Sequence, residues 1–399
     1  MPKLSVRAGE VPASPIRKLT PLAEEAVRRG LKVFHLNIGQ PDVPSPQVGL
    51  DALRHIDRTV LEYSPSEGFY GLRKGWADYY RSFGVAIEAG DVVVTTGASE
   101  AVLFGLLSCL NPGDEVIAPE PLYANYIAFT TAAGVTLRPV AMTIETGFCM
   151  PGVAAFEALV NERTKAILLC NPNNPTGNVY TRQELEAIGD LARRYDLYLF
   201  ADEVYREFNY SGTPFVSALH LQGLEEQVVV FDSFSKRYSE CGIRIGTIIT
   251  RNAALRAAVL KLCQARLSPP LLGQIVAEAS WAAPADYRQS VYEEYKARRD
   301  CLLDGLSRIP GVVCPVPQGA FYAMVELPVD DAERFCAWCL SDFSYEGQTV
   351  MLAPGAGFYV TPGLGQRQVR MAYVLQKNEL ERALLVLSKA LAAYPGRRD

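Results

Sequence analysis

The sequence predicts an α/β protein, with a mixed, mostly parallel sheet in a large domain and a smaller α+β domain. The main observation is an alternation between about Asp91 and residue 252, where short apolar, β-branched runs take turns with amphipathic helical segments. Such alternation is typical of βαβ units whose sheet is buried on both faces. After Gly311, by contrast, two strand signals stand among helical segments. With 399 residues, the chain has room for about two to three domains.

Composition and charge exclude several classes of protein. Hydrophobic residues make up 49% of the chain and charged residues 21%, so wholesale disorder is not expected. The net charge of −5 provides no basic excess for a nucleic-acid partner. No uncharged apolar run approaches the about 18 residues of a membrane span, and the first residues lack the apolar core of a secretory signal. We therefore expect a cytoplasmic protein with no nucleic-acid or membrane partner.

The cysteine and histidine content argues against a disulfide framework or a metal site. Nine cysteines, an odd number, are spread along the chain, which favours a reducing compartment. The close pair Cys336 and Cys339 falls in a helical stretch without a second pair to complete a zinc site. The three histidines, His35, His55 and His220, are far apart in the sequence. We expect no bound metal.

The expected elements follow in order along the chain. A helix is predicted over residues 21–29 and a strand over 33–37, and the proline-rich segment from Gly39 prevents regular structure. Helical periodicity covers residues 47–83, with a break at 63–68. The seven strands of the central alternation are expected at 92–95, 115–118, 137–140, 166–170, 198–201, 228–232 and 247–250. A long charged helix over about 286–308 and strands at 321–327 and 368–373 complete the chain.

Two cationic residues follow the strand expected at 228–232. Lys236 lies four residues past this strand, and Arg244 lies eight residues further on. Ligands of α/β sheets bind at the carboxyl ends of strands, so Lys236 is a candidate for a lysine that forms an imine with a carbonyl group. Arg244 beside it suits a phosphate, which a guanidinium binds through two hydrogen bonds. The alternatives are a surface lysine and an ordinary ion-pair arginine.

Polar residues also follow the strands expected at 198–201 and 166–170. Asp202 closes an apolar strand, where a carboxylate is costly unless it is paired, and beneath a pyridine ring it would keep the ring nitrogen protonated. Alternatively, Asp202 caps a following helix. Tyr205, three residues later, is placed to donate to a phenolic oxygen. Asn174 lies in the loop Asn-Pro-Asn-Asn-Pro-Thr-Gly, whose prolines force a fixed turn that aims it at a ligand.

Four further residues complete the candidate site. Ala98 and Ser99 follow a strand and open a helix, so their backbone N–H groups form an anion site. Tyr123 closes another strand and can stack on an aromatic ligand. Arg370 lies inside a strand, and a buried arginine needs an anion, either an internal acid or a substrate carboxylate. Together, these residues indicate one ligand, a phosphorylated pyridine aldehyde held by an imine.

These motifs resemble the class I/II aminotransferases. The resemblance rests on Asn174-Pro-Thr-Gly, on Asp202-Glu-Val-Tyr, and on Ser233-Phe-Ser-Lys236 with Arg244 eight residues later, and it spans the chain from residue 37 to Arg370. It implies the fold of the fold-type I pyridoxal-phosphate enzymes and pyridoxal 5′-phosphate as the cofactor. It also implies transfer of an amino group from an L-amino acid to a 2-oxo acid.

The resemblance implies a role for each residue around the cofactor. Lys236 would carry it as an aldimine and would move the proton in the 1,3-shift, and Asp202 would hold the pyridine nitrogen protonated. Asn174 and Tyr205 would contact the phenolic oxygen, and Tyr123 would lie over the ring. The phosphate would be bound by Ala98, Ser99, Ser233 and Arg244.

The same resemblance implies the substrate contacts, the partner and the domains. Arg370 would bind the substrate α-carboxylate with help from Gly39 and Asn174, and Tyr63 would reach the phosphate of the partner subunit in a homodimer. Residues 1–45 would form an N-terminal arm and part of the small domain, residues 46–285 the large cofactor-binding domain, and residues 286–399 the rest of the small domain. Closure of the small domain would then bring Arg370 onto the substrate.

The sequence defines the substrates less well than the cofactor. Aspartate and 2-oxoglutarate are expected from their frequency in the family. Arg266 and Arg237 are candidate ligands for a distal carboxylate, and the alternative for each is a structural ion pair, which for Arg237 would be with Glu240. The alternative function is a pyridoxal-phosphate lyase of the same fold, such as a carbon–sulfur lyase or an aminocyclopropane-carboxylate synthase.

Overall fold

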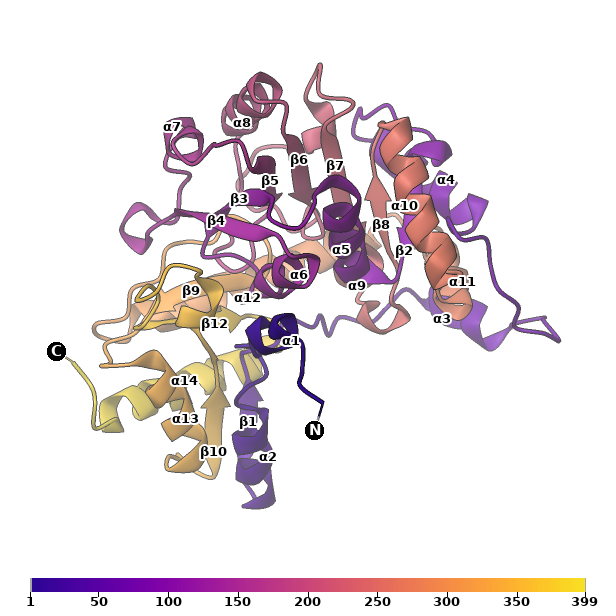
Figure 1. Cartoon of the computed structure of the whole chain (residues 1–399). Coiled ribbons are helices and arrows are strands. Elements are labelled where there is room, and N and C mark those ends of the chain that lie inside the picture. Colours follow the sequence, from indigo (N-terminus) through magenta and orange to yellow (C-terminus); the bar gives the residue numbers. More distant parts are fainter. Residues whose placement is uncertain (1, 399) are drawn as a thin grey trace.

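The largest sheet of the protein has seven strands, in the order β2-β8-β7-β6-β5-β3-β4 (Figure 1). The structure, a computed structural model, describes residues 2–398. The strands are β2 (Val92–Thr95), β3 (Glu115–Glu120), β4 (Thr136–Ala141), β5 (Thr164–Cys170), β6 (Tyr198–Asp202), β7 (Val228–Ser233) and β8 (Gly246–Ile249). β8 is antiparallel to both of its neighbours, and the other pairings are parallel. The predicted mixed, mostly parallel sheet is confirmed, with every strand end within two residues of its expected place.

Successive residues of each strand point into two different cores. Along β7, Val229 and Phe231 pack into one apolar cluster, and Val228 and Val230 pack into the other. This period of two explains the nearly continuous apolar runs, because both faces of the sheet are covered. Helices α5, α6 and α10 cover the first face, and helices α4 and α8 cover the second.

The helices around the large sheet account for most of the remaining residues up to about 280. They are α3 (Gln47–Arg54), α4 (Tyr70–Arg81), α5 (Gly97–Cys109), α6 (Asn125–Ala133), α7 (Val153–Glu157), α8 (Arg182–Arg194), α9 (Phe234–Arg237), α10 (Ala253–Arg266) and α11 (Leu271–Ser280). Short 3₁₀ turns lie at Ala89–Asp91, Ile144–Thr146, Ala218–His220 and Cys241–Ile243. α9 is the element that carries Lys236.

The remaining elements come from both ends of the chain. The N-terminal β1 (Lys32–His35) pairs in parallel with β10 (Gln348–Met351), and an antiparallel sheet has the order β11-β12-β9. The other elements are α1 (Val6–Glu10), α2 (Thr20–Arg28), α12 (Tyr287–Ser307), β9 (Tyr322–Glu326), α13 (Ala332–Ser341), β11 (Ala353–Pro354), a 3₁₀ turn at Gly355–Phe358, β12 (Gln368–Ala372) and α14 (Lys377–Ala393). Figure 1 shows the N-terminal α2 and β1 beside the C-terminal α13, α14 and β10. On this pairing we propose that residues 1–45 belong with the small domain.

Two expectations for local structure are wrong. The helical prediction over 47–83 fails over residues 55–62, which follow the end of α3, whereas the expected break at 63–68 is confirmed. In that segment the apolar residues Val60 and Leu61 are exposed, so the periodic pattern does not mark a buried stripe. β10 was not expected, because its four residues, Gln-Thr-Val-Met, form too short an apolar run to be distinguished from a loop. Among residues 2–398, none of the helices combines the length and the apolar character required to cross a bilayer.

Candidate active site

A cavity of about 240 Å³ lies at the carboxyl ends of β5, β6 and β7, beside the first turn of α5. Its opposite wall comes from the segments near Arg17 and Gly39 and from β9 and β12. Eleven of the twelve residues predicted from the sequence line this cavity. They are Gly39, Ala98, Ser99, Tyr123, Asn174, Asp202, Tyr205, Ser233, Lys236, Arg244 and Arg370. Tyr63, the twelfth, lies outside the cavity and is 76% exposed.

One end of the cavity is suited to an anion. Arg244 has a left-handed backbone (φ 59°), and its Nη1 donates to the carbonyl of Cys241 over 3.0 Å. Gly97 opens α5 with φ 72°, and a Cβ at this position would lie 2.4 Å from Nη2 of Arg244. Only glycine therefore lets the guanidinium reach the N-terminus of α5, where free backbone N–H groups attract negative charge.

The same end is closed by β8 and by the serine at the end of β7. A Cβ on Gly246 would lie 2.5 Å from the backbone nitrogen of Ala98, so β8 packs directly against the start of α5. The hydroxyl of Ser233 donates to Ser235 over 2.8 Å and lines the cavity together with Ser99. Backbone donors, two hydroxyl groups and a guanidinium thus converge on one place, which is the donor set that a phosphate monoester requires.

Asp202 is a buried carboxylate with no ion pair in the described part of the chain. Its Oδ2 accepts a hydrogen bond from the hydroxyl of Tyr126 (2.6 Å), and its Oδ1 accepts one from the backbone N–H of Val204 (3.3 Å). A turn follows Asp202, so the alternative that it caps a helix is wrong. Burial raises the pKa of Asp202 to about 6, and the hydrogen bond from Tyr126 opposes this shift. A protonated ring nitrogen would supply the positive partner that the carboxylate lacks.

The substitution Asp202→Asn is expected to stabilise the ligand-free protein at neutral pH. The pKa of this carboxyl is about 6 in the folded protein and about 3.9 in an unfolded chain, so between these values only the folded state holds the proton. The wild-type free energy of unfolding should therefore fall, relative to the variant, by a few kcal/mol as the pH rises from about 4 to 6. Urea unfolding of both ligand-free proteins between pH 4 and 8 measures this difference. A difference that does not change with pH would contradict it.

A chain of hydrogen bonds connects the two sides of the cavity. The side-chain nitrogen of Asn174 donates to the hydroxyl of Tyr205 (3.3 Å), which lies 3.0 Å from the hydroxyl of Tyr322 on β9. Burial holds the pKa of Tyr205 well above its usual value, so its hydroxyl keeps the proton that it can donate. A Cβ at Gly39 would lie 1.8 Å from the Tyr322 oxygen, so glycine is required for this approach. The structure thus brings Asn174 and Tyr205 together, with Tyr322 as an additional member of the chain.

Arg370 is 1% exposed and has only neutral partners among residues 2–398. Its Nη1 donates to Oδ1 of Asn174 (3.1 Å), and its Nη2 donates to the carbonyl of Asn37. Its guanidinium lies 4.4 Å from the ring centre of Tyr322, and its Nε has no hydrogen-bond partner. Burial lowers the pKa of Arg370. The internal-acid alternative is therefore wrong, and a buried cation without a counter-ion faces the cavity, ready for a ligand carboxylate.

The amino group of Lys236 lies in the cavity and not on the open surface. Its Nζ donates to the carbonyl of Gly39 over 2.9 Å and lies 3.9 Å from Sγ of Cys241. It forms no ion pair with a carboxylate in the described part of the chain, so the amine is not held by a salt bridge. Lys236 and Arg370 line the same cavity, which places a reactive amine near a carboxylate-binding group.

The two arginines considered for a distal carboxylate are both engaged elsewhere. Arg237 is fully buried in an ion pair with Asp232 (2.5 Å), so the expected pairing with Glu240 is wrong. Glu240 instead accepts a hydrogen bond from Ser280 (2.6 Å). Arg266 pairs with Glu100 (3.1 Å), and neither arginine lines the cavity of its own chain. The structural ion-pair alternative therefore describes both residues.

Sequence reasoning missed several residues of the cavity. Tyr322 and Arg17 line it, and Tyr126 and Asn37 bond directly to Asp202 and Arg370. Tyr126 lies three residues after Tyr123, so a helical turn at this point would have brought it to the same side. The others lie on segments that are distant in sequence, and no local signal pairs them with the site.

The fold and this cavity define the class of protein. They are typical of an α/β enzyme that binds a phosphorylated pyridine ring. Pyridoxal 5′-phosphate fits the residues present, because the cavity combines the anion cradle at Gly97 and Arg244, the unpaired carboxylate of Asp202 and the free amine of Lys236. Residues 32–387 match the family described as aminotransferase class I and II. The chain belongs to this family and is a pyridoxal-phosphate-dependent aminotransferase.

Individual relatives cover almost the whole chain. The aspartate aminotransferase of Thermotoga maritima is 31% identical over 383 residues, which are 96% of this chain and 97% of that protein. The solved structure of aspartate aminotransferase from Thermus thermophilus with maleate has a TM-score of 0.88 and 28% identity, covering 98% of this chain and 100% of that one. An alanine aminotransferase from Pyrococcus furiosus has a TM-score of 0.88 and 30% identity, covering 97% and 99%.

Proposed function

We propose that this aminotransferase takes aspartate as its amino donor and 2-oxoglutarate as its acceptor. The observation that carries the proposal is Arg17, an exposed arginine at the cavity that forms no ion pair among residues 2–398. Since Arg370 is suited to the α-carboxylate, a second free guanidinium at the same cavity is suited to a second carboxylate. Substrates with two carboxylates are therefore favoured over those with one.

The segment that carries Arg17 is held in place on both sides. The side chain of Asn37 donates to the carbonyl of Ile16 over 2.8 Å, and Ile16 packs on the cluster that contains Phe358. Lys18, on the other side, forms an ion pair with Glu333. Asn37 also accepts from Arg370, so the two arginines are connected through one residue. This anchoring favours a fixed position for Arg17 over a freely moving side chain.

The names of the relatives support an aminotransferase but do not choose between donors. Aspartate aminotransferases and an alanine aminotransferase resemble this chain about equally well, at TM-scores of 0.88. The relatives described above are aminotransferases, so the lyase alternative is not favoured. Only the residues of the cavity therefore distinguish between the donors.

Different residues of this chain would bind different parts of the cofactor. Arg244, Ser233 and the N-terminus of α5 at Ala98 and Ser99 would hold the phosphate. Asp202 would keep the ring nitrogen protonated, Asn174 and Tyr205 would donate to the phenolic oxygen, and Tyr123 would lie against the ring. Pyridoxal phosphate, when bound, supplies an electron-withdrawing ring that stabilises negative charge on the substrate α-carbon.

Side chains that line the same cavity would bind and deprotonate the substrate. Arg370 and Asn174 would bind the α-carboxylate, and Arg17 the distal one, which fixes the orientation of the α-carbon. Lys236 would then take the proton from this carbon and return it at a neighbouring position, since its amine has no competing salt bridge. Proton transfer by a positioned side chain contributes typically about 10²–10⁴-fold to the rate.

The variant Arg17→Gln tests the proposed donor. Loss of a charge-assisted hydrogen bond should lower kcat/KM for aspartate by about 10- to 100-fold, while alanine, which has no distal carboxylate, should react unchanged. Oxo-acid formation from each amino acid by the cofactor-loaded enzyme gives these ratios. Lys18→Gln is the matched control, because it removes a neighbouring charge that is paired with Glu333. Equal losses for aspartate and alanine, or a wild-type enzyme that prefers alanine, would overturn the proposal.

We also propose that the enzyme is a homodimer with shared active sites. Tyr63 lies outside the cavity of its own chain and is 76% exposed, and nearby Val60 and Leu61 are 65% and 62% exposed. Exposed apolar residues that cluster in this way are typical of a protein interface. The proposed partner is a second copy, whose phosphate site Tyr63 would reach, and the molar mass in solution tests this.

A further inference from the structure

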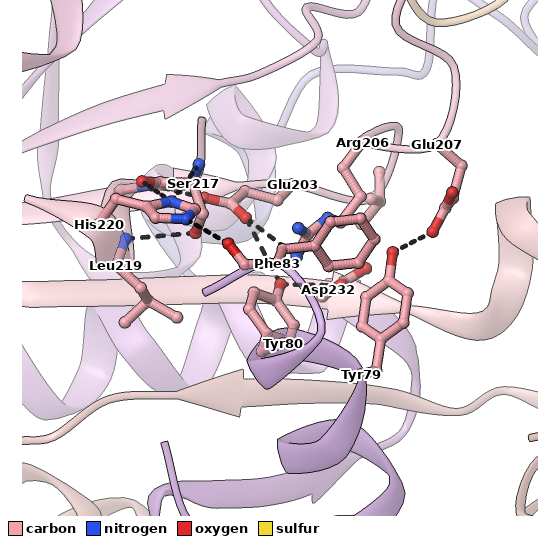
Figure 2. A network of polar contacts seen from close by, with 12 residues as sticks. Tyr79, Tyr80, Phe83, Glu203, Arg206, Glu207, Ser217, Leu219, His220 and Asp232 are labelled. Carbon is pink, nitrogen blue, oxygen red and sulfur yellow. Dashed lines mark hydrogen bonds and ion pairs between the residues drawn. The ribbon is translucent and has the colours of Figure 1, made fainter. Parts of the chain in front are cut away.

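A network of buried charged and aromatic residues lies against the face of the sheet that α4 covers (Figure 2). Its fully buried acidic members are Asp232 and Glu203, and its fully buried cations are Arg237 and Arg206. All four side chains are at most 2% exposed. Of these four residues, the sequence indicated only Arg237, as a candidate for a distal carboxylate or for an ion pair, and it forms an ion pair with Asp232. The network therefore needs an explanation of its own.

The core of this network is the ion pair between Arg237 and Asp232. Nη2 of Arg237 lies 2.5 Å from Oδ2 of Asp232, and the guanidinium lies 4.2 Å from the ring centre of Tyr79 and 4.8 Å from that of Trp76. Oδ1 of the same aspartate accepts from the backbone N–H of Ser233 (2.7 Å). The pair thus connects the end of β7 to α9 and to the aromatic side chains of α4.

Tyr80 extends the network from Asp232 to the next strand. Its hydroxyl donates to Oδ2 of Asp232 (2.9 Å) and lies 3.5 Å from Oε2 of Glu203, and Figure 2 shows it between the two carboxylates. Glu203 is fixed in turn by the hydroxyl of Ser217 (2.7 Å) and the backbone N–H of Ala218 (2.8 Å). The guanidinium of Arg206 lies 4.3 Å from the ring centre of Tyr80. One hydroxyl therefore connects the ends of β6 and β7.

Each anchored residue is the direct chain neighbour of a residue that lines the cavity. Glu203 follows Asp202, Asp232 precedes Ser233, and Arg237 follows Lys236. Asp232 and Ser233 point to opposite faces because they are neighbours in a strand. In all three couples one member lines the cavity and the other lies in the network. The network thus restrains, from behind, the backbone that carries a ring-nitrogen contact, a phosphate contact and the reactive lysine.

We propose that Asp232, Arg237 and Tyr80 are positioning residues for catalysis, which hold Lys236 in a fixed place relative to Asp202. This inference rests on the proposed role of Lys236. None of the three touches the cavity, so their effect should be on the orientation of the amine and not on substrate binding. A misplacement of about 1 Å at a reacting group can cost about 10²-fold in rate.

The variant Tyr80→Phe is the sharpest test, since it removes one hydroxyl and keeps the ring. We expect kcat to fall about tenfold, with KM within about threefold of the wild type, for whichever donor the wild-type enzyme accepts best. We also expect a changed pH midpoint for the absorbance of the cofactor-loaded protein, which a merely structural role would not move. Tyr180→Phe is the matched control, because Tyr180 is a buried tyrosine in the same apolar cluster whose hydroxyl has no partner.

A second pair of variants tests the ion pair itself. Removing Arg237 alone would leave the buried charge of Asp232 uncompensated and is expected to be strongly destabilising. The double variant Asp232→Asn with Arg237→Gln removes both charges and should show the same fall in kcat at unchanged KM. Arg237→Lys keeps a cation beside Asp232, so its kcat should lie between that of the double variant and that of the wild type.

Two results would distinguish a failure of this inference from a failure of the proposed function. If Tyr80→Phe has the kcat and the absorbance midpoint of the wild type, even with a lower unfolding temperature, the network is only structural and the inference is overturned. If Lys236→Ala retains full activity, the proposed function of Lys236 fails, whatever the network does. Tyr80→Phe decides the inference when the double variant does not fold.

Discussion

The substitution Lys236→Ala is expected to reduce kcat by about 10⁴-fold, the upper end of the range for a general base, while cofactor binding persists. The amine of Lys236 lies in the cavity, bonded only to the carbonyl of Gly39 and near Cys241, and no second lysine lines the cavity in the described part of the chain. No other basic group there can both link to the cofactor and move the substrate proton. The phosphate contacts at Arg244 and Ser233 remain, so the variant should still bind pyridoxal phosphate.

Borohydride treatment followed by mass spectrometry checks this prediction directly. In the wild type, reduction should fix the cofactor to the peptide that contains Lys236, and in the variant no peptide should carry it. Lys261→Ala is the matched control, since it removes an exposed lysine on α10 and should leave both labelling and turnover intact. Labelling of a different lysine in the wild type would show that Lys236 is not the attachment point.

The substitution Arg370→Ala should have the next largest effect, lowering kcat/KM by about 10²–10³-fold for every amino acid donor. Removing one partner of a fully buried charge pair typically costs about 2–5 kcal/mol. The substrate α-carboxylate would lose the only buried cation among the described residues that line this cavity. Because the α-carboxylate is common to all donors, aspartate and alanine should lose the same factor. This distinguishes Arg370 from Arg17, whose removal should affect aspartate alone.

Steady-state kinetics with both donors measures the effect of Arg370→Ala. Arg370→Lys should retain more kcat/KM than Arg370→Ala but less than the wild type, since an ammonium group keeps the charge but not the two parallel hydrogen bonds. Arg367→Ala is the matched control, because it removes a nearby exposed arginine that pairs with Glu326. An Arg370→Ala enzyme with the wild-type KM for its amino acid would show that another group binds the α-carboxylate.

Much of the site could be predicted because its polar residues follow apolar strands. Asp202 is the last residue of β6, Lys236 and Asn174 come just after the ends of β7 and β5, and parallel strand ends meet at one edge of a sheet. The pattern of apolar runs therefore determined both the sheet and the place where these side chains gather.

The residues that were missed lack such a local signal. Tyr322 and Tyr126 are tyrosines within a strand and a helix, where a buried aromatic residue is usually part of the core. The partner of Arg237 was predicted wrongly for a related reason. Asp232 lies near the end of β7 and Arg237 at the end of α9, and only the three-dimensional course of the backbone from β7 into α9 shows that their side chains meet.

The parallel pair of β1 and β10 has a consequence for the synthesis of the protein. Lys32 pairs with Gln348, so almost the entire chain must be made before β1 can find its partner. At about 5–20 residues per second, the ribosome releases β1 roughly 15 to 60 s before β10. During that time an unpaired strand edge, with Phe34 otherwise buried, is open to other nascent chains. Chaperone demand should therefore depend on how quickly the residues between β1 and β10 are translated.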